Sequence, residues 1–217
     1  MLVLALLVLV LGLGELAAES SGPEEGQAPV VLFFGDSLTD SYGVEPEEAY
    51  PAVLQARVDS LGWAYKMVNA GLAGETSAAG MRRVNWVLKK RPDYFVLALG
   101  ANDGLRGIPL ESTRQNLQAI VDRVLAKYPE VEIVIAGMLM PPSLGPEYTA
   151  EFAALFPALA RENDLPLIPF LLEEVGGVPR YNQADGIHPN AAGHRLVADN
   201  VWAVLGPLLD PEPDQAP

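Results

Sequence analysis

The chain has 217 residues, half of them apolar, which is enough for one domain with a substantial core. Fourteen basic side chains against 28 acidic ones give a formal net charge of −14, which disfavours a DNA-binding or peripheral-membrane role. The sequence contains no cysteine, which excludes disulfides, zinc–thiolate sites, iron–sulfur clusters and thiol nucleophiles. Two histidines are too few for a multi-histidine metal site.

The first residues form an apolar run from Leu2 to Leu13, interrupted only by Gly12 and followed by Gly-Glu-Leu-Ala-Ala. At about 1.5 Å per residue such a helix is too short to cross ~30 Å of hydrocarbon, so residues 1–18 are interpreted as a signal peptide, although no Lys or Arg precedes the run. A buried core helix is the alternative, disfavoured because residues 19–29 are polar and typical of a flexible linker. We therefore expect a periplasmic or secreted protein with a folded domain over 30–209 and a disordered acidic tail over 210–217.

Short apolar runs in the folded part predict five β-strands. Each run is continuous rather than alternating, which is typical of strands covered on both faces. The expected strands are Val30–Phe34, Tyr65–Asn69, Tyr94–Leu99, Val131–Gly137 and, more weakly, Leu167–Pro169.

The segments between these runs carry the helical period of apolar residues. One helix is predicted by Leu117, Ile120, Val121, Val124 and Leu125, and another by Met81, Val84, Val87 and Leu88, which we expect Lys89-Lys90-Arg91-Pro92 to close. Alternating strands and helices predict right-handed crossovers and a mainly parallel sheet between two helix layers. Ligand sites in such sheets lie beyond the carboxyl ends of the strands. Four polar clusters fall at predicted strand ends or in late loops: 35–39, 69–74, 100–103 and 185–188.

Ser37 follows a strand and a Gly-Asp turn, and the apolar-rich segment after it is expected to begin a helix. A serine in that place is either a nucleophile beside helical N–H groups or simply a helix cap. His188 favours the first alternative because a serine hydroxyl needs a base, and Asp185 is placed to accept its Nδ1–H. His194 is interpreted as a surface or packing residue.

Two further residues are candidate donors toward a developing negative charge. Gly74 has no side chain to obstruct its N–H, and Asn102 carries an amide at the end of a predicted strand. Their alternatives are an ordinary turn glycine and a loop-stabilising amide.

Together the motifs G-D-S-L at 35–38, N-A-x-x-x-G at 69–74, G-x-N-D at 100–103 and D-x-x-H at 185–188 resemble the SGNH-hydrolase superfamily of GDSL-type esterases and lipases. The likeness covers residues 30–208 and is greatest to bacterial periplasmic members described as thioesterases, lysophospholipases and arylesterases. It implies a flavodoxin-like three-layer α/β/α sandwich with a five-stranded sheet. It also implies Ser37 as nucleophile with Asp185 and His188 completing the triad, and an oxyanion hole from the N–H groups of Ser37 and Gly74 and the Asn102 side chain. Gly74 is preferred to Gly71 because its Gly-Glu-Thr context matches the family's Gly-Asp-Thr.

The resemblance implies acyl transfer to Ser37 and hydrolysis of the acyl-enzyme, without a metal or organic cofactor. The expected substrate is a small-molecule or lipid ester, with no nucleic-acid partner, no stable membrane insertion once the signal is removed, and a monomeric state. Segments 105–109 and 140–148 are similar to the family's mobile substrate loops. Candidate substrate contacts are Asp36, Leu105, Arg106, Met140, Tyr148, Ile187 and Pro189, with Met138, Leu144 and Phe152 as further candidates for an acyl groove.

Three alternatives remain. The same fold also suits an O-acetyl-glycan esterase. A metal-dependent phosphoesterase would use Asp36, Asp103, Asp185 and His188 as ligands. A non-catalytic carbohydrate- or lipid-binding relative would require the loss of a catalytic residue that this sequence retains.

Overall fold

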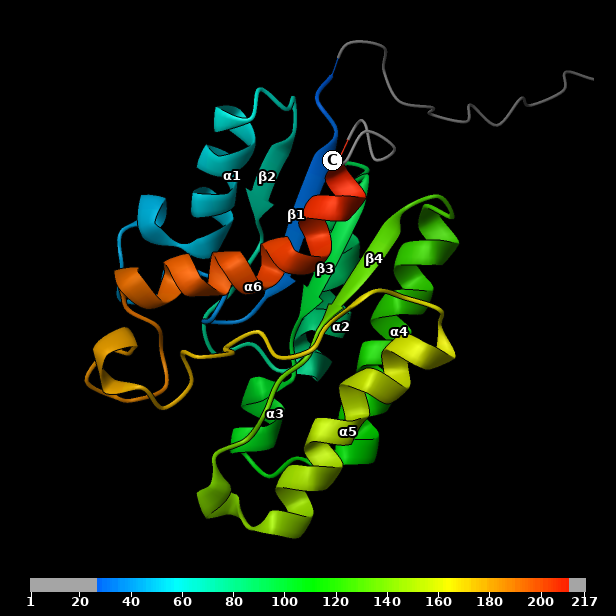
Figure 1. The fold of residues 1–217 in the computed structure, drawn as a ribbon. Coiled ribbons are helices and arrows are strands. Elements are labelled where there is room, and N and C mark those ends of the chain that lie inside the picture. The colour runs from blue at the N-terminus through cyan, green and yellow to red at the C-terminus, as the bar shows by residue number, and fades with distance from the viewer. Residues whose placement is uncertain (1–26, 211–217) are drawn as a thin grey trace, which may run out of the picture.

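The structure, a computed structural model that describes residues 27–210, is built around a parallel sheet between two layers of helices (Figure 1). The strands run in the order β2-β1-β3-β4-β5, and every neighbouring pair is parallel. This is the flavodoxin-like order, so the expected three-layer α/β/α fold is confirmed. The strands are β1 Val30–Gly35, β2 Lys66–Asn69, β3 Tyr94–Ala98, β4 Glu132–Ala136 and β5 Leu167–Ile168.

The helices divide between the two faces of the sheet. Helices α1 and α6 pack together on one face, whereas α2, α4 and α5 cover the other (Figure 1). Their bounds are α1 Tyr50–Ser60, α2 Ser77–Val87, α4 Leu110–Lys127, α5 Pro146–Glu162 and α6 Ala191–Leu209, with a short α3 at Ala101–Leu105 and 3-10 turns at Pro46–Glu48, Pro142–Leu144 and Pro179–Tyr181. No helix within residues 27–210 is both long enough and apolar enough to cross a membrane. The predicted signal peptide, most of the linker and nearly all of the tail lie outside the described residues and stay predictions.

Strand β1 lies inside the sheet, between β2 and β3, and shows why continuous apolar runs predict interior strands. Its consecutive residues Phe33 and Phe34 are both fully buried, on opposite faces of the sheet. The Phe33 ring meets Tyr50 of α1 edge-on at 5.4 Å between centroids, and Phe34 meets Phe95 of β3 at 5.5 Å. The sheet is therefore held by apolar packing on both sides.

Strand β2 departs from this pattern, because none of its residues is fully buried. It is an edge strand, and α2 packs mainly against α4 rather than across it. The expectation that every strand is covered on both faces is wrong for β2. Helix α2 ends at Val87, and Lys89 and Lys90 lie in the turn and bend that directly follow it.

His194 lies on α6 and is a packing residue rather than a surface one. Its side chain is almost fully buried, its ring stacks on Tyr50 at 6.4 Å, and its Nδ1 accepts the backbone N–H of Tyr50 at 3.3 Å. Burial lowers the pKa of His194 to about 4, because charging the ring would place an imidazolium in the core.

We expect the neutral state of His194 to make the fold sensitive to acid. Its pKa is depressed from 6.5, so its contribution is complete above pH 6.5 and is lost as pH falls toward 4. In His194→Asn, which keeps an acceptor but does not titrate, unfolding free energy should fall by about 3 kcal/mol less than in the wild type between pH 7 and pH 4. Urea unfolding at the two pH values measures this difference, and equal losses in both proteins would contradict it.

Candidate active site

Ser37 lies in a tight turn directly after β1, at the carboxyl end of the sheet between β1 and β3. The Asp36 carboxylate accepts the N–H of Leu38 at 3.0 Å, and the Asp36 carbonyl accepts the N–H of Asp40 at 2.9 Å. The residues from Ser37 to Gly43 form turns rather than a helix, Gly43 takes a positive φ of 74° that ends them, and α1 begins only at Tyr50. The expectation that a helix begins after Ser37 is wrong, and so is the helix-cap alternative for Ser37.

The loop before α6 brings His188 and Asp185 to Ser37 from 151 residues away in the chain. His188 Nε2 lies 2.9 Å from Ser37 Oγ, and His188 Nδ1 lies 2.7 Å from Asp185 Oδ2. The three side chains thus form one continuous hydrogen-bonded chain from carboxylate through imidazole to hydroxyl. This arrangement can take a proton from the serine hydroxyl and hold the resulting imidazolium.

Asp185 is held in its charged form. Its partial desolvation, which raises the pKa, is outweighed by the backbone N–H and the ring of His188 and by the N–H of Ile187, and the pKa falls to about 2. Both N–H groups meet Oδ1, which leaves Oδ2 for the imidazole. The carboxylate therefore stays ionised at neutral pH and fixes the orientation of the ring.

Asn102 sits at the start of α3, next to the serine turn. Its Nδ2 donates to Asp36 Oδ2 at 3.3 Å and to the carbonyl of Glu75 at 3.2 Å, so it also links loops as its alternative interpretation proposed. Gly74 has a φ of 76°, which also fits the turn-glycine alternative. Within the described residues, the N–H groups of Ser37 and Gly74 have no acceptor. The contacts of Asn102 thus join the serine turn and the loop of Glu75 to the start of α3.

Gly71, the competing glycine, serves a packing purpose. A Cβ there would lie 2.3 Å from the backbone nitrogen of Asp40, so only glycine lets the loop after β2 approach the serine turn.

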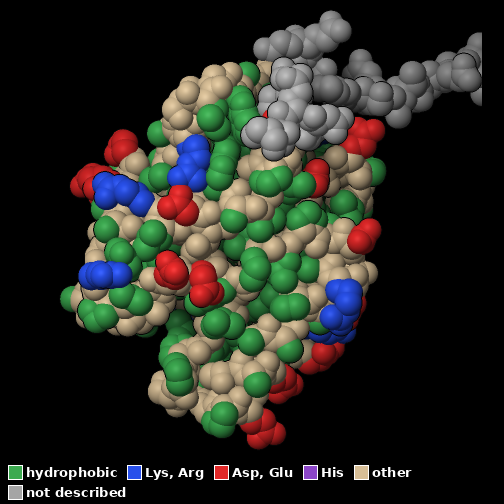
Figure 2. Space-filling view, viewed as in Figure 1, with side chains coloured by type: hydrophobic (Ala, Val, Ile, Leu, Met, Phe, Trp, Pro, Cys, Tyr) green, Lys and Arg blue, Asp and Glu red, His purple; other side chains and the backbone are tan. Residues whose placement is uncertain are grey.

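A cavity of about 440 Å³ opens beside Ser37 and His188. Figure 2 shows the hollow at the lower left, between the loop that precedes α6 and the segment that precedes α5. Of the candidate substrate contacts, four line the cavity, Asp36, Leu105, Met140 and Ile187, and so does Met138, a further candidate for the acyl groove. Other apolar lining comes from Leu38, Leu139, Pro141, Phe170 and Leu172.

The remaining candidates lie outside the lining of this cavity. Tyr148 donates its hydroxyl to the carbonyl of Gly104 at 3.0 Å, and Pro189 is buried in a bridge with Asn182. Arg106 turns toward the loop of Gly74. Phe152 is fully buried in the core, and Leu144 is exposed away from the cavity.

Two features of the site have no sequence motif to reveal them. The Tyr42 ring lies 4.5 Å from the His188 ring, between centroids, and covers one side of the imidazole. The buried Glu75 pairs with Arg83, whose Nε donates to it at 2.7 Å and whose Nη2 donates to the carbonyl of Ala70 at 2.9 Å. This pair anchors the loop of Gly74 to α2. In the sequence, only the spacing of eight positions between an acidic residue and an arginine hints at this ion pair.

Asp103 is buried away from the reacting groups. Its carboxylate accepts the N–H of Ser77 at 2.8 Å and the hydroxyl of the same residue, at the start of α2. Within residues 27–210, no three acidic or histidine side chains are grouped so that they could hold a metal ion. The donor set required by the phosphoesterase alternative is therefore not assembled.

Residues 33–196 match the model of the GDSL-like Lipase/Acylhydrolase family. The chain belongs to this family. The GDSL hydrolases that it resembles include Esterase TesA of Pseudomonas aeruginosa, 37% identical over 187 residues, which cover 86% of this chain and 92% of that protein. Thioesterase 1/protease 1/lysophospholipase L1 of Escherichia coli is 37% identical over 186 residues, covering 84% and 86%.

A crystal structure of TesA superposes with a TM-score of 0.79 at 37% identity, covering 82% of this chain and 99% of that one. The recognition of the family from its four motifs is confirmed, and the protein is a hydrolase that acts on acyl esters.

We expect Asp36 to make the fold more stable at low pH, the opposite of the effect of His194. Burial raises its pKa from 3.8 to about 6, against the lowering effect of the Leu38 N–H and the Asn102 amide. A raised pKa stabilises the fold at low pH, and that contribution is lost as pH rises through 6. Relative to Asp36→Asn, which does not titrate, the wild type should gain about 2 kcal/mol of unfolding free energy between pH 7.5 and pH 4.

Urea unfolding of the wild type and of Asp36→Asn in the same buffers measures this, as the difference in unfolding free energy between the two proteins at each pH. A constant difference across this range would show that Asp36 titrates normally.

Proposed function

We propose that the protein hydrolyses carboxylic esters and thioesters through an acyl-enzyme formed on Ser37. The observation that carries the proposal is the hydrogen-bonded chain that joins Asp185, His188 and Ser37 at 2.7 and 2.9 Å. This geometry places the imidazole within reach of the hydroxyl proton and places the carboxylate where it orients the imidazole.

In the first half-reaction, Ser37 Oγ attacks the acyl carbon while His188 Nε2 takes the hydroxyl proton. The tetrahedral intermediate collapses, the imidazolium returns the proton to the leaving alcohol or thiol, and the acyl group remains on Ser37. In the second half-reaction, His188 takes a proton from water, which attacks the ester, and the proton then returns to Ser37 as the carboxylic acid departs. Asp185 stabilises the imidazolium in both steps.

The oxyanion of each tetrahedral intermediate is assigned to the N–H groups of Ser37 and Gly74 and to Asn102 Nδ2. The two contacts that Asn102 Nδ2 makes in the free site are long for N–H···O bonds, so the amide can turn toward a stronger, charged acceptor. Arg106 supports both donors, because its Nη2 donates to the carbonyl of Gly74 at 3.1 Å and contacts Asn102 Oδ1 at 3.5 Å.

The acyl group is assigned to the cavity of about 440 Å³, whose lining is mostly apolar. Such a lining suits fatty-acyl or aryl groups better than a sugar, and thus favours an esterase, thioesterase or lysophospholipase over an O-acetyl-glycan esterase. The relatives named TesA and Thioesterase 1/protease 1/lysophospholipase L1 support the same substrate class. We also propose that the enzyme is exported and acts as a monomer, the export resting on the apolar run over residues 2–13.

We expect Ser37→Ala to lower kcat for p-nitrophenyl acyl esters by at least about 10⁴-fold, because no other hydroxyl takes the place of the nucleophile. Ser41→Ala, which removes a serine from the same turn segment, is the matched control and should retain activity. Thermal unfolding shows that both variants fold. Full activity of folded Ser37→Ala would refute the proposal.

Arg106 gives a second test, which separates support of the oxyanion donors from contact with substrate. We expect Arg106→Gln to lower kcat about 10- to 100-fold with little change in KM, because the carbonyl of Gly74 loses its partner and the donors shift. Arg106→Lys, which keeps one charged donor, should recover part of the loss. A raised KM with unchanged kcat would instead place Arg106 in substrate binding.

A further inference from the structure

A second hollow of about 740 Å³ lies at the edge of the sheet, and it shares no lining residue with the catalytic cavity. We call it the basic groove; it is lined by residues 27 and 28 and by residues from β1, β2, the loop 70–72, α2 and the segment 89–91. It exists because β2 is not covered by α2, which leaves apolar side chains such as Val68 and Val87 along its floor. Its volume falls in the usual range for small-molecule sites.

The charge of the basic groove is opposite to that of the whole chain. Five of the 14 Lys and Arg residues line it, and no Asp or Glu does, although the chain carries a net charge of −14. Within the described residues, Lys66, Lys89 and Lys90 form no ion pair. On the face seen in Figure 2, in contrast, basic and acidic side chains are interspersed. Uncompensated cations lining one hollow favour an anionic ligand.

The basic groove also exposes large apolar side chains to solvent. Trp86 is the most exposed large apolar side chain among residues 27–210, at 65%, and Leu72 is 49% exposed. Lys89 Nζ lies 5.7 Å from the centre of the Trp86 ring, so charge and aromatic surface stand side by side. Apolar floor and cationic rim together match a molecule with an acyl chain and a negatively charged head.

We propose that the basic groove binds a single-chain anionic amphiphile, of the class of long-chain carboxylates. The head group lies against Lys89 and Lys90, and the chain lies along Trp86 and the floor. A concave site accommodates a single molecule better than it accommodates the flat surface of a bilayer. A carboxylate of this class is also what hydrolysis of a fatty-acyl ester releases, but binding at the basic groove does not require the chemistry assigned to Ser37.

Isothermal titration with laurate below its micellar concentration tests the proposal. The wild type should bind it, whereas 1-O-dodecyl glycerol, an ether with a chain of the same length and a neutral head that the enzyme cannot hydrolyse, should bind at least about tenfold more weakly. Added salt should weaken laurate binding. The double variant Lys89→Glu, Lys90→Glu should lose at least about tenfold in affinity and keep its hydrolysis of a short soluble ester.

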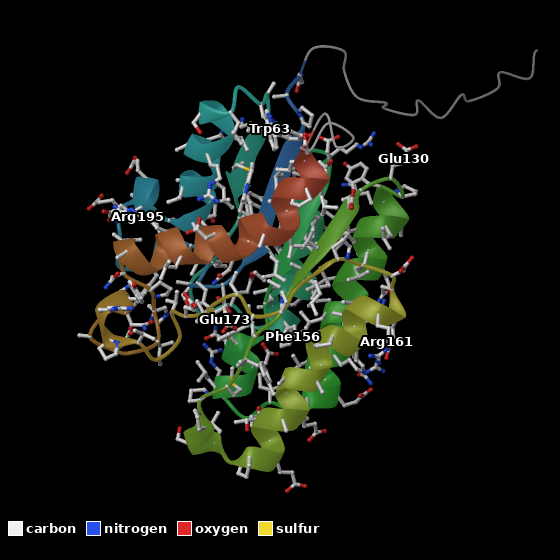
Figure 3. The ribbon with its side chains drawn as sticks, viewed as in Figure 1. Trp63, Glu130, Phe156, Arg161, Glu173 and Arg195 are labelled. Carbon is white, nitrogen blue, oxygen red and sulfur yellow. The ribbon has the colours of Figure 1, made fainter. Side chains whose placement is uncertain are left out.

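The matched control reverses the same amount of charge elsewhere. Arg161 and Arg195 project into solvent from α5 and α6 (Figure 3), so the double variant Arg161→Glu, Arg195→Glu should bind laurate within about twofold of the wild type. An equal loss in this control would assign the effect to overall charge and overturn the proposal.

Other outcomes also decide against it. Laurate that competes with the short ester and is unaffected by the change at Lys89 and Lys90 would lie only in the catalytic cavity. Binding to anionic vesicles without binding to monomeric laurate would make the surface a membrane contact. Binding only after removal of residues 19–26 would show that the preceding segment of the chain occupies the basic groove. We expect Ser37→Ala to lose hydrolysis and to bind laurate as the wild type does, so the failure of one proposal can be told apart from the failure of the other.

Discussion

The buried carboxylate of Asp36 is the group on which the arrangement of the site depends. One of its oxygens accepts the N–H of Leu38 and shapes the serine turn, and the other accepts Nδ2 of Asn102 and ties that turn to α3. Asn102 then reaches the carbonyl of Glu75, and Arg106 joins Asn102 to Gly74. Segments from three parts of the chain are therefore positioned through one side chain, whose burial raises its pKa to about 6.

Asp185 and Asp36 both lie near the His188 imidazole, but their environments are opposite. Asp185 is exposed and receives two N–H groups as well as the ring, which lowers its pKa to about 2, whereas Asp36 is buried and its pKa is raised. Hence Asp185 carries a full charge at neutral pH and orients His188 directly. Asp36 interacts with His188 only through space, since its oxygens are occupied by Leu38 and Asn102. In the mechanism proposed above the two acids have different tasks, since Asp185 orients the base and Asp36 holds the turn.

The sequence predicts the sheet and the site for the same reason, since continuous apolar runs identify strands and polar clusters at their ends mark the place where ligands bind. It does not predict that Ser37 is followed by a turn, because Gly43 and the side-chain bond of Asp36 override an apolar-rich segment. It does not reveal Tyr42 or the Glu75–Arg83 pair, because their contacts form only in the folded chain and belong to no sequence motif. It also misses the exposed face of β2, because coverage of an edge strand depends on where its neighbouring helix packs.

The net charge of the chain does not reveal how charge is distributed over its surface, and the basic groove is a cationic site on an acidic protein. Arg83 belongs both to that groove and to the loop of Gly74, since it lines the first and binds Glu75 and the carbonyl of Ala70 in the second. Its guanidinium is bound to a buried carboxylate, faces the ring of Phe34 at 4.3 Å and is thus fixed on several sides. A ligand that meets the exposed ammonium groups of Lys89 and Lys90 leaves these contacts in place. Two sites can therefore share one loop of the fold while the donors beside Ser37 keep their positions.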